Sequence, residues 1–300
     1  MKIKPDLYLK GVFMGIAEII PGVSGGTIAF ITGIYEELID SIKSVNSRSL
    51  KLLLTLKFSS FWKEINGSFL ITLILGMLTS ILILSRFIVY LIDVHPFKIW
   101  GFFFGLIIAS SILIFYQIQK LSITVFLSFV IGLSISSYIA LQAPSSTPNT
   151  NFFIFISGAI AISAMILPGI SGSFILVFLS KYEFILKALN SFDTAVISIF
   201  LVGCIVGLVT FSRVFSYLFK RYNDVVISVL IGFLFGSLFK IWPFYEVLEY
   251  NSANEPIYTS PILPTANQSN DLVFFFTFGV IGFVSMWVLE KKFIGLNKEI

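Results

Sequence analysis

The stretch that decides the fold is residues 11–44, GVFMGIAEIIPGVSGGTIAFITGIYEELIDSIKS, in which proline, glycine and hydroxyl side chains interrupt an apolar run. A related stretch, GAIAISAMILPGISGSFILVFLSKYEFILKALN, follows at residues 158–190. When residue 11 is placed on residue 158, the sequence PGVSG of Pro21–Gly25 falls on the sequence PGISG of Pro168–Gly172. The chain therefore carries the same interrupted motif twice.

The residues Pro21, Gly22, Pro168 and Gly169 are predicted to break the helix in the two motifs. Proline removes a backbone donor, and glycine costs a helix about 1 kcal/mol relative to alanine. Unsatisfied backbone groups are costly in hydrocarbon, so such a break survives only inside protein or beside a polar cavity. Two breaks at corresponding places in two halves indicate a transporter's binding site. The alternative is a pair of kinked or closely packed helices, since small residues also serve helix contact.

The composition is that of a membrane protein. Of the 300 residues, 57% are hydrophobic and 12% are charged, and the mean hydropathy is +0.96. Soluble domains carry about a quarter charged residues. The apolar residues form runs long enough to cross about 30 Å of hydrocarbon. These runs are residues 68–92, 98–118, 121–141, 195–219, 225–243 and 271–289. We therefore expect an all-α polytopic membrane protein.

Several kinds of chemistry are excluded by what the sequence lacks. Cys204 is the single cysteine and His95 the single histidine, so we expect no disulfide framework, no metal site and no cofactor. The pattern G-x-x-x-x-G-K-[ST] of nucleotide-binding loops is absent, and nothing suggests a nucleic-acid partner. The apolar N-terminal run is interrupted by Glu18 and has no small-residue cleavage site, so we interpret it as retained rather than as a signal peptide.

The sequence predicts two membrane repeats, residues 1–141 and 152–292, joined by an external linker at 142–151. Each contains a re-entrant helical hairpin followed by three transmembrane helices. The hairpins are expected at about 11–44 and 153–188, and a basic amphipathic surface helix at about 48–64. Matches between the later spans support a duplication: Ser85-Arg86 on Ser212-Arg213, Gly101–Gly105 on Gly232–Gly236, and Val130–Gly132 on Val280–Gly282.

The orientation follows from the lysines and arginines near the span ends. The N-terminus and residues 43–63 are rich in them and are placed inside, whereas 142–151 and 244–270 contain none and are placed outside. These placements agree only if each interrupted segment enters and leaves on the same side. Three spans per repeat is an odd number, so the second repeat is predicted to be inverted, with both termini cytoplasmic.

Each interrupted motif has the chemistry of an anion site. A helix that begins at mid-membrane presents unpaired N–H groups and a partial positive charge, which is how phosphate and carboxylate groups bind at helix N-termini. Facing tips of two inverted hairpins would enclose one such site. The candidate phosphate-binding residues are Ser24, Gly25, Gly26 and Thr27 in the first motif and Ser171, Gly172 and Ser173 in the second.

Three charged residues in apolar segments are further candidates. Arg86 and Arg213 occupy matching positions late in a span, where a guanidinium can bind phosphate with two hydrogen bonds. The equally open alternative is that they reach to the membrane interface. Glu18 is the single acid in the rising arm of the first hairpin, and its counterpart is Met165. It is the candidate for binding a coupling proton, the alternative being an acid that caps its neighbours.

The two motifs resemble those of a known family. G-x-x-M-G-x-A-E-x-x-P-G-V-S-G-G-T-I-A-x-x-x-G-I-Y-E, at Gly11–Glu36, looks like the signature of the bacterial polyprenyl-phosphate transporters, long known as a domain of unknown function. P-G-I-S-G-S-F, at Pro168–Phe174, resembles the second signature, and the likeness covers essentially the whole chain. The sequence departs from the family in having Glu18 where aspartate is frequent. It also has Ser180 where the first half has Gly33.

The resemblance implies a translocase that returns undecaprenyl phosphate, a lipid carrier of cell-wall synthesis, from the outer to the inner leaflet of the bacterial cytoplasmic membrane. Proton or ion coupling is an open part of this expectation, and oligomeric state is undetermined. One alternative is a small-anion or ion channel that uses the same site, although the spans are poor in polar residues. The other is a lipid-modifying membrane enzyme, which would need an acid/base or metal set that the sequence lacks.

Overall fold

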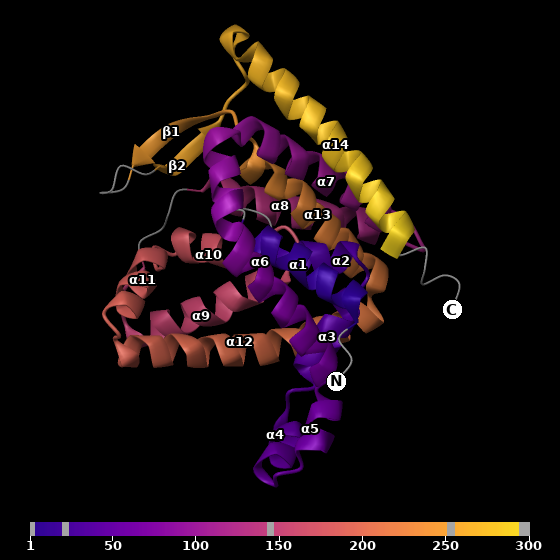
Figure 1. The fold of residues 1–300 in the computed structure, drawn as a ribbon, viewed down its shortest axis with the longest axis vertical. Helices are drawn as coiled ribbons and strands as arrows, with labels where there is room; N and C mark the ends of the chain where they lie inside the picture. The colour runs from indigo at the N-terminus through magenta and orange to yellow at the C-terminus, as the bar shows by residue number, and fades with distance from the viewer. Residues whose placement is uncertain (1–3, 20–23, 143–146, 251–255, 294–300) are drawn as a thin grey trace.

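The computed structural model describes residues 4–19, 24–142, 147–250 and 256–293, which are almost entirely helical (Figure 1). The elements of the first half are α1 (Pro5–Ile19), α2 (Gly25–Ile31), α3 (Tyr35–Lys43), α4 (Ser47–Leu54), α5 (Phe58–Glu64), α6 (Gly67–Val94), α7 (Pro96–Phe115) and α8 (Ile123–Leu141). Those of the second half are α9 (Asn151–Ile166), α10 (Gly172–Phe178), α11 (Tyr182–Asn190), α12 (Thr194–Arg221), α13 (Asn223–Ile241), β1 (Tyr245–Tyr250), β2 (Pro256–Pro261) and α14 (Ser269–Phe293).

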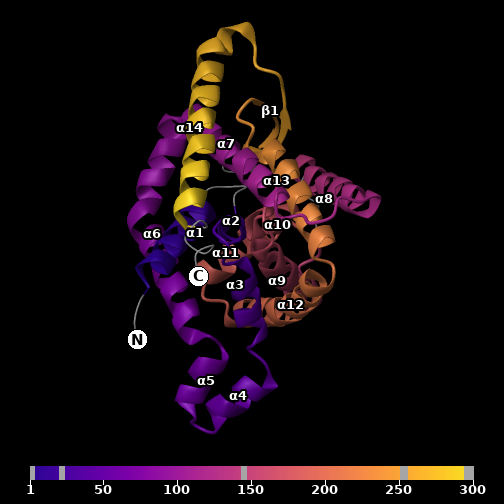
Figure 2. The same ribbon diagram turned by 90° about the vertical axis from the view of Figure 1, so that its right-hand side faces the viewer.

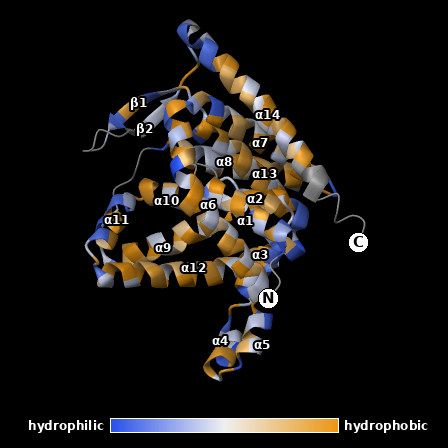
Figure 3. Ribbon diagram, viewed as in Figure 1, coloured by the Kyte–Doolittle hydropathy of each residue, from blue (hydrophilic) through white to orange (hydrophobic). Residues whose placement is uncertain are grey.

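The expectation of a helical, multi-pass membrane protein is confirmed. Within the described part of the chain, the 6 helices α6, α7, α8, α12, α13 and α14 are long and apolar enough to cross a membrane. Each coincides with one of the runs predicted from the sequence. Apolar residues dominate α9, α12 and α14, while polar residues gather at α11, at β1 and β2, and around α3 (Figure 3).

Each interrupted segment consists of three helices rather than two. In the second, Pro168 and Gly169 separate α9 from α10, and Gly169 has a φ of +82°, a conformation that favours glycine. The corresponding Pro21 and Gly22 lie outside the described residues. A further turn follows α2 at Gly33 (φ 71°) and follows α10 at Ser180 (φ 52°). The serine thus adopts the left-handed backbone of the glycine that it replaces.

The turns at Gly33 and Ser180 are built in the same way. The N–H of Ile34 donates to the carbonyl of Ala29, as the N–H of Lys181 does to that of Leu176. In each case the left-handed residue directly precedes the donor. This arrangement is the Schellman cap that ends many helices. It stops α2 and α10 after two turns, a feature that the sequence reading did not include.

The bounds of the helices repeat between the halves. Helices α2 and α10 begin 147 residues apart (Gly25 and Gly172), and α3 and α11 do the same. Helices α6 and α12 begin 127 residues apart (Gly67 and Thr194) and end with the same separation (Val94 and Arg221). These offsets are the ones that the sequence motifs gave, so the recurring helix pattern supports a duplication.

One of the sequence matches is wrong by one helical turn. Helices α7 and α13 begin 127 residues apart (Pro96 and Asn223), whereas matching Gly101 with Gly232 requires 131. The packing agrees with 127, because a Cβ on Gly105 would collide with the backbone of Gly279, and one on Gly232 would collide with that of Phe129. Phe129 corresponds to Gly279, so Gly105 corresponds to Gly232. Glycines four residues apart leave this choice open in the sequence, because a shift of one turn still places glycine on glycine.

The two halves are interlocked through their last two helices. Helix α7 packs along α14, and α13 packs along α8, so each half supplies one helix to a pair with the other (Figures 1 and 2). Within each half the first helix packs along the first span, α1 on α6 and α9 on α12. Glycine contacts recur here too. A Cβ on Gly11 would meet the carbonyl of Leu73, and one on Gly158 the carbonyl of Phe200.

The surface helix expected at 48–64 is two short helices, α4 and α5. Thr55, Leu56 and Lys57 separate them, and Leu56 has a φ of 56°. The N–H of Lys57 donates to the carbonyl of Leu52, which makes another Schellman cap and ends α4. An antiparallel hairpin, β1 with β2, fills part of the polar loop after α13, where only a connection was expected.

Candidate functional site

The two motifs lie in direct contact. The Ser24 hydroxyl donates a hydrogen bond to the Met165 carbonyl at 2.7 Å. The Gly169 N–H donates to Thr27 Oγ1 at 3.0 Å. Both hydroxyl side chains are buried. A Cβ on Gly26 would collide with the Ile166 carbonyl, so a side chain at this position would separate the two segments. The contact joins residues more than 140 positions apart in the chain.

In the first motif, the backbone donors at the start of α2 are already engaged. The Gly25 N–H donates to Glu18 Oε1 at 2.8 Å, and the Gly26 N–H donates to Ser24 Oγ at 3.0 Å. Ser24 is therefore the N-cap of α2, and Glu18 supplies a carboxylate to the same end. The position expected for a phosphate is occupied here by an acid of the protein itself.

The second motif is less fully bonded. The Ser171 and Ser173 hydroxyls are 2.8 Å apart, and the Ser173 side chain is exposed while Ser171 is buried. Although Ser171 is the N-cap residue of α10, no side chain of the described residues accepts a hydrogen bond from the first turn of that helix. The Gly172 and Ser173 N–H groups therefore remain available to a ligand in a way that those of the first motif are not.

A pocket adjoins the second motif and contains a lysine. Its lining residues come from α8, the second motif and α13: Ser136, Ile139, Ala140, Gly169, Ile170, Ser171, Phe174, Ser237 and Lys240. The ammonium of Lys240 lies 4.3 Å from the centroid of the Phe174 ring, a cation–π contact. Among the residues that the structure describes, no carboxylate pairs with it. The pocket thus places a positive charge beside Ser171.

Lys240 is a candidate site residue that the sequence did not single out. It stands in the last turn of α13, where a lysine is usually interpreted as reaching toward the membrane interface. The sequence signal that could have indicated it is a charged residue inside the apolar run 225–243. Only the packing of α13 against the second motif shows that the side chain turns to Phe174.

The structure does not bring Arg86 or Arg213 to the motifs. Both Arg86 and Arg213 are exposed. In the part of the chain described here, neither guanidinium forms a hydrogen bond or ion pair with a motif residue, and neither lines the pocket at Ser171. Their role in phosphate binding stays a prediction.

Comparisons with known proteins find relatives over most of the chain. A family model described as undecaprenyl phosphate translocase-like matches residues 14–257. A polyprenyl-phosphate transporter of Vibrio cholerae is 45% identical over 83% of this chain and 82% of its own length. A polyprenyl-phosphate transporter of Staphylococcus aureus is 34% identical over 78% of this chain and 85% of its own length. No solved structure matches the chain. With two contacting motifs, six apolar helices and these matches, the chain belongs to the undecaprenyl phosphate translocase-like family.

Proposed function

We propose that this protein is a translocase that moves polyprenyl phosphate, such as undecaprenyl phosphate, across the bacterial cytoplasmic membrane for reuse of the carrier lipid. The observation that carries the proposal is the contact of the two motifs beside Lys240. It sets hydroxyls, the uncapped first turn of α10 and the Lys240 ammonium close together in a helical protein with six apolar spans. The names of the relatives and of the family support the same substrate.

The second motif is the proposed phosphate site. The Lys240 ammonium would neutralise part of the phosphate charge, and charge-assisted hydrogen bonds of this kind are stronger than neutral ones. Ser171, Ser173 and the Gly172 N–H would donate the remaining hydrogen bonds. A lipid phosphate has a small charged head and a long apolar tail, so the head can pass between the motifs while the tail stays in the bilayer. No continuous pore is then required.

The first motif is proposed to couple transport to a proton. A phosphate that approached the Gly25 N–H would meet the carboxylate of Glu18, which holds that N–H in this structure. Two anions that lie close together in a low-dielectric environment repel each other. Phosphate should therefore bind more easily when Glu18 is protonated than when Glu18 is ionised. Glu18 and the lipid head would then be linked through one backbone donor.

The proposed topology is two inverted repeats, each with a re-entrant hairpin, and both termini in the cytoplasm. Its support is the recurrence of the helix bounds and the exchange of partners between α7–α14 and α8–α13. Figure 1 is consistent with it. Helices α4 and α5 lie at the bottom and the end of α14 at the right, whereas α11 lies at the left and β1 and β2 at the upper left.

Labelling of single cysteines tests this topology in a Cys204→Ser background. An impermeant thiol reagent applied to intact cells should modify Glu246→Cys, in β1, and leave Ser47→Cys, at the start of α4, unmodified until the cells are opened. Both positions are exposed, so accessibility within the protein is matched. Modification of Ser47→Cys in intact cells would contradict the re-entrant first segment.

Flipping in liposomes tests the function and its alternatives together. Purified protein is reconstituted with polyprenyl phosphate, and head groups in the outer leaflet are followed by an impermeant modifying enzyme. We expect flipping that is absent from protein-free liposomes. In a parallel sample without the modifying enzyme, the lipid mass should stay unchanged. Release of trapped inorganic phosphate without lipid flipping would favour the channel, and a changed lipid mass in the parallel sample would favour a lipid-modifying activity of the protein itself.

A further inference from the structure

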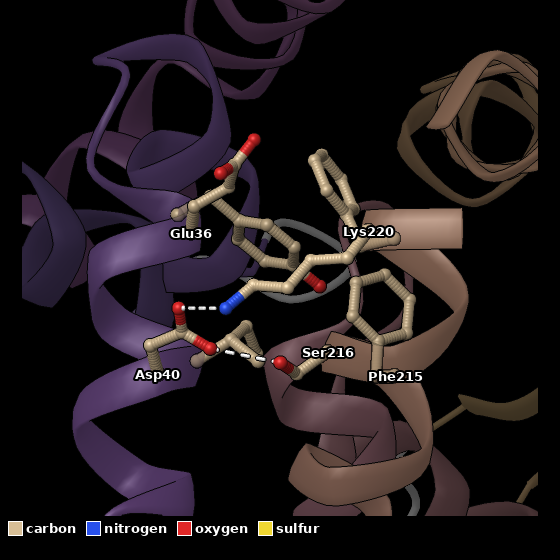
Figure 4. A pocket seen from close by; sticks show the side chains of 8 residues that line it. Glu36, Asp40, Phe215, Ser216 and Lys220 are labelled. Carbon is tan, nitrogen blue, oxygen red and sulfur yellow. Dashed lines mark hydrogen bonds and ion pairs between the residues drawn. The ribbon is translucent and has the colours of Figure 1, made fainter. Parts of the chain in front are cut away.

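Helix α3, which ends the first hairpin, is held against the C-terminal end of α12. Lys220 Nζ lies 2.7 Å from Asp40 Oδ2, and the Ser216 hydroxyl donates to Asp40 Oδ1 at 2.8 Å (Figure 4). Desolvation acts to raise the pKa of Asp40, but the hydrogen bonds from Lys220 and Ser216 outweigh it and lower that pKa. Behind this pair, Tyr35 packs edge-on against Phe215, with ring centroids 5.6 Å apart. The contact is an apolar interface with an ion pair at its rim.

The counterpart contact, between α11 and α6, is not formed. Among the described residues these two helices make no contact of comparable extent, and α11 stands apart from α6 in Figure 1. Burial shows the same difference. Tyr35 is 2% exposed and its counterpart Tyr182 is 40% exposed. Ile39 is 2% exposed and its counterpart Leu186 is 41% exposed. One apolar surface is covered, and the equivalent surface is not.

The ion pair of the formed contact has a counterpart with the charges exchanged. By the offsets of the helix bounds, Asp40 corresponds to Lys187 and Lys220 corresponds to Asp93. In this second pair, helix α11 of the hairpin carries the cation and the span α6 carries the anion. In this structure Lys187 lies 3.7 Å from its neighbour Glu183, and Asp93 is exposed, with no ion pair in the described part of the chain. The two corresponding positions therefore again carry opposite charges, with the signs exchanged.

We infer that Asp93 and Lys187 form the ion pair of a second closed state, in which α11 packs on α6 as α3 packs on α12 here. The inference rests on the proposed function, because a translocase with one site between two repeats must expose that site to one side at a time. In the proposed topology, the present state is closed on the cytoplasmic side and open on the outer side. Transport would then alternate between the Asp40–Lys220 contact and the Asp93–Lys187 contact.

Two features make the formed contact suitable for release. The Tyr35 hydroxyl is buried without a hydrogen-bond partner in the described chain, and opening would return it to polar surroundings. The ion pair is partly exposed, with side chains 59% and 43% accessible for Lys220 and Asp40, and such pairs contribute little net stability. Small differences in free energy can therefore decide which of the two contacts forms.

Cross-linking in membranes tests the inference in a Cys204→Ser background. The inner pair is Asp40→Cys with Lys220→Cys, and the outer pair is Asp93→Cys with Lys187→Cys. A short, cleavable bifunctional thiol reagent should join either pair, as read by mass spectrometry of the linked peptides. Each link should stop lipid flipping, and its cleavage should restore flipping.

The matched control pairs Lys187→Cys with Phe87→Cys, an exposed residue on another face of α6. A yield for the outer pair no higher than for this control would overturn the inference. Because cross-linking is read without a transport assay, it stays informative even if the transported lipid proves to be a different one. In that case the outer pair still links while polyprenyl phosphate is not flipped.

Charge exchange supplies a second measurement. Asp93→Lys and Lys187→Asp should each lower transport severalfold through repulsion of like charges, and the double variant should recover most of it. A merely structural role for either residue would not predict this recovery. A double variant that is no better than the single variants, at equal protein levels in the membrane, would count against the pair.

Discussion

The two motifs have nearly the same sequence and different surroundings. The first is closed: the Gly25 N–H is bound to Glu18, and the Ser24 hydroxyl is bound to the other motif. The second opens onto a pocket in which Lys240 lies beside Ser171. The first motif therefore presents an acid and the second a cation. The two motifs are alike in sequence, and the residues packed against them differ, which is why we propose a proton site at the first and a phosphate site at the second.

The largest expected effect is at the cation of the second motif. Lys240→Gln removes the charge but keeps much of the side chain, and we expect flipping to fall at least about tenfold, which corresponds to about 1.4 kcal/mol of lost stabilisation. Lys240→Arg keeps the charge and should retain much of the activity. Normal flipping by Lys240→Gln would show that the second motif does not use this lysine and would remove the contrast between the motifs.

The acid of the first motif is expected to set the pH dependence of transport. Glu18→Gln resembles the protonated acid, so it should still bind lipid phosphate while flipping no longer changes with pH. Glu36→Gln, in the same hairpin at the start of α3, is the matched control and should keep the pH profile of the unmodified protein. An unchanged profile in Glu18→Gln would leave Glu18 as a structural cap of α2.

Exchanging one residue between the motifs should show that the first motif is more tightly packed than the second. Gly26 and Ser173 are counterparts, but Gly26 lies against the Ile166 carbonyl, whereas Ser173 is exposed. Gly26→Ser inserts atoms into a packed contact, which typically costs about 1–3 kcal/mol of stability. Ser173→Gly should leave thermal stability in detergent nearly unchanged. Equal shifts of Tm for the two variants would mean that the first motif is no more tightly packed than the second.

The smallest effect is expected at the paired arginines. Because neither guanidinium contacts a motif in the described chain, Arg86→Lys and Arg213→Lys should each flip lipid at close to the normal rate. The planar fork of arginine matters only where it binds with two hydrogen bonds. A strong loss in either variant, at normal protein level, would restore direct phosphate binding by that arginine in another state of the protein.

Much of the fold was predictable, because its signals are local. Each of the six spans is a run of apolar residues, and Pro168 with Gly169 marks a helix break wherever it packs. The offset of α13 was not predictable, since the glycines of α7 repeat every four residues and permit a shift of one turn. The caps at Leu56 and Ser180 were missed because non-glycine residues there adopt left-handed conformations.

The sequence by itself determined that this chain is a helical membrane protein with a duplicated, interrupted motif, because apolar length and helix-breaking residues act within a few turns of chain. It also placed hydroxyls and glycines at both breaks. Only the tertiary structure decided which partners those groups have. Glu18 reaches Gly25 across seven residues, but Lys240 meets Phe174 only because α13 packs beside the second motif. Such contacts depend on how distant helices pack, and no local pattern in the chain encodes that.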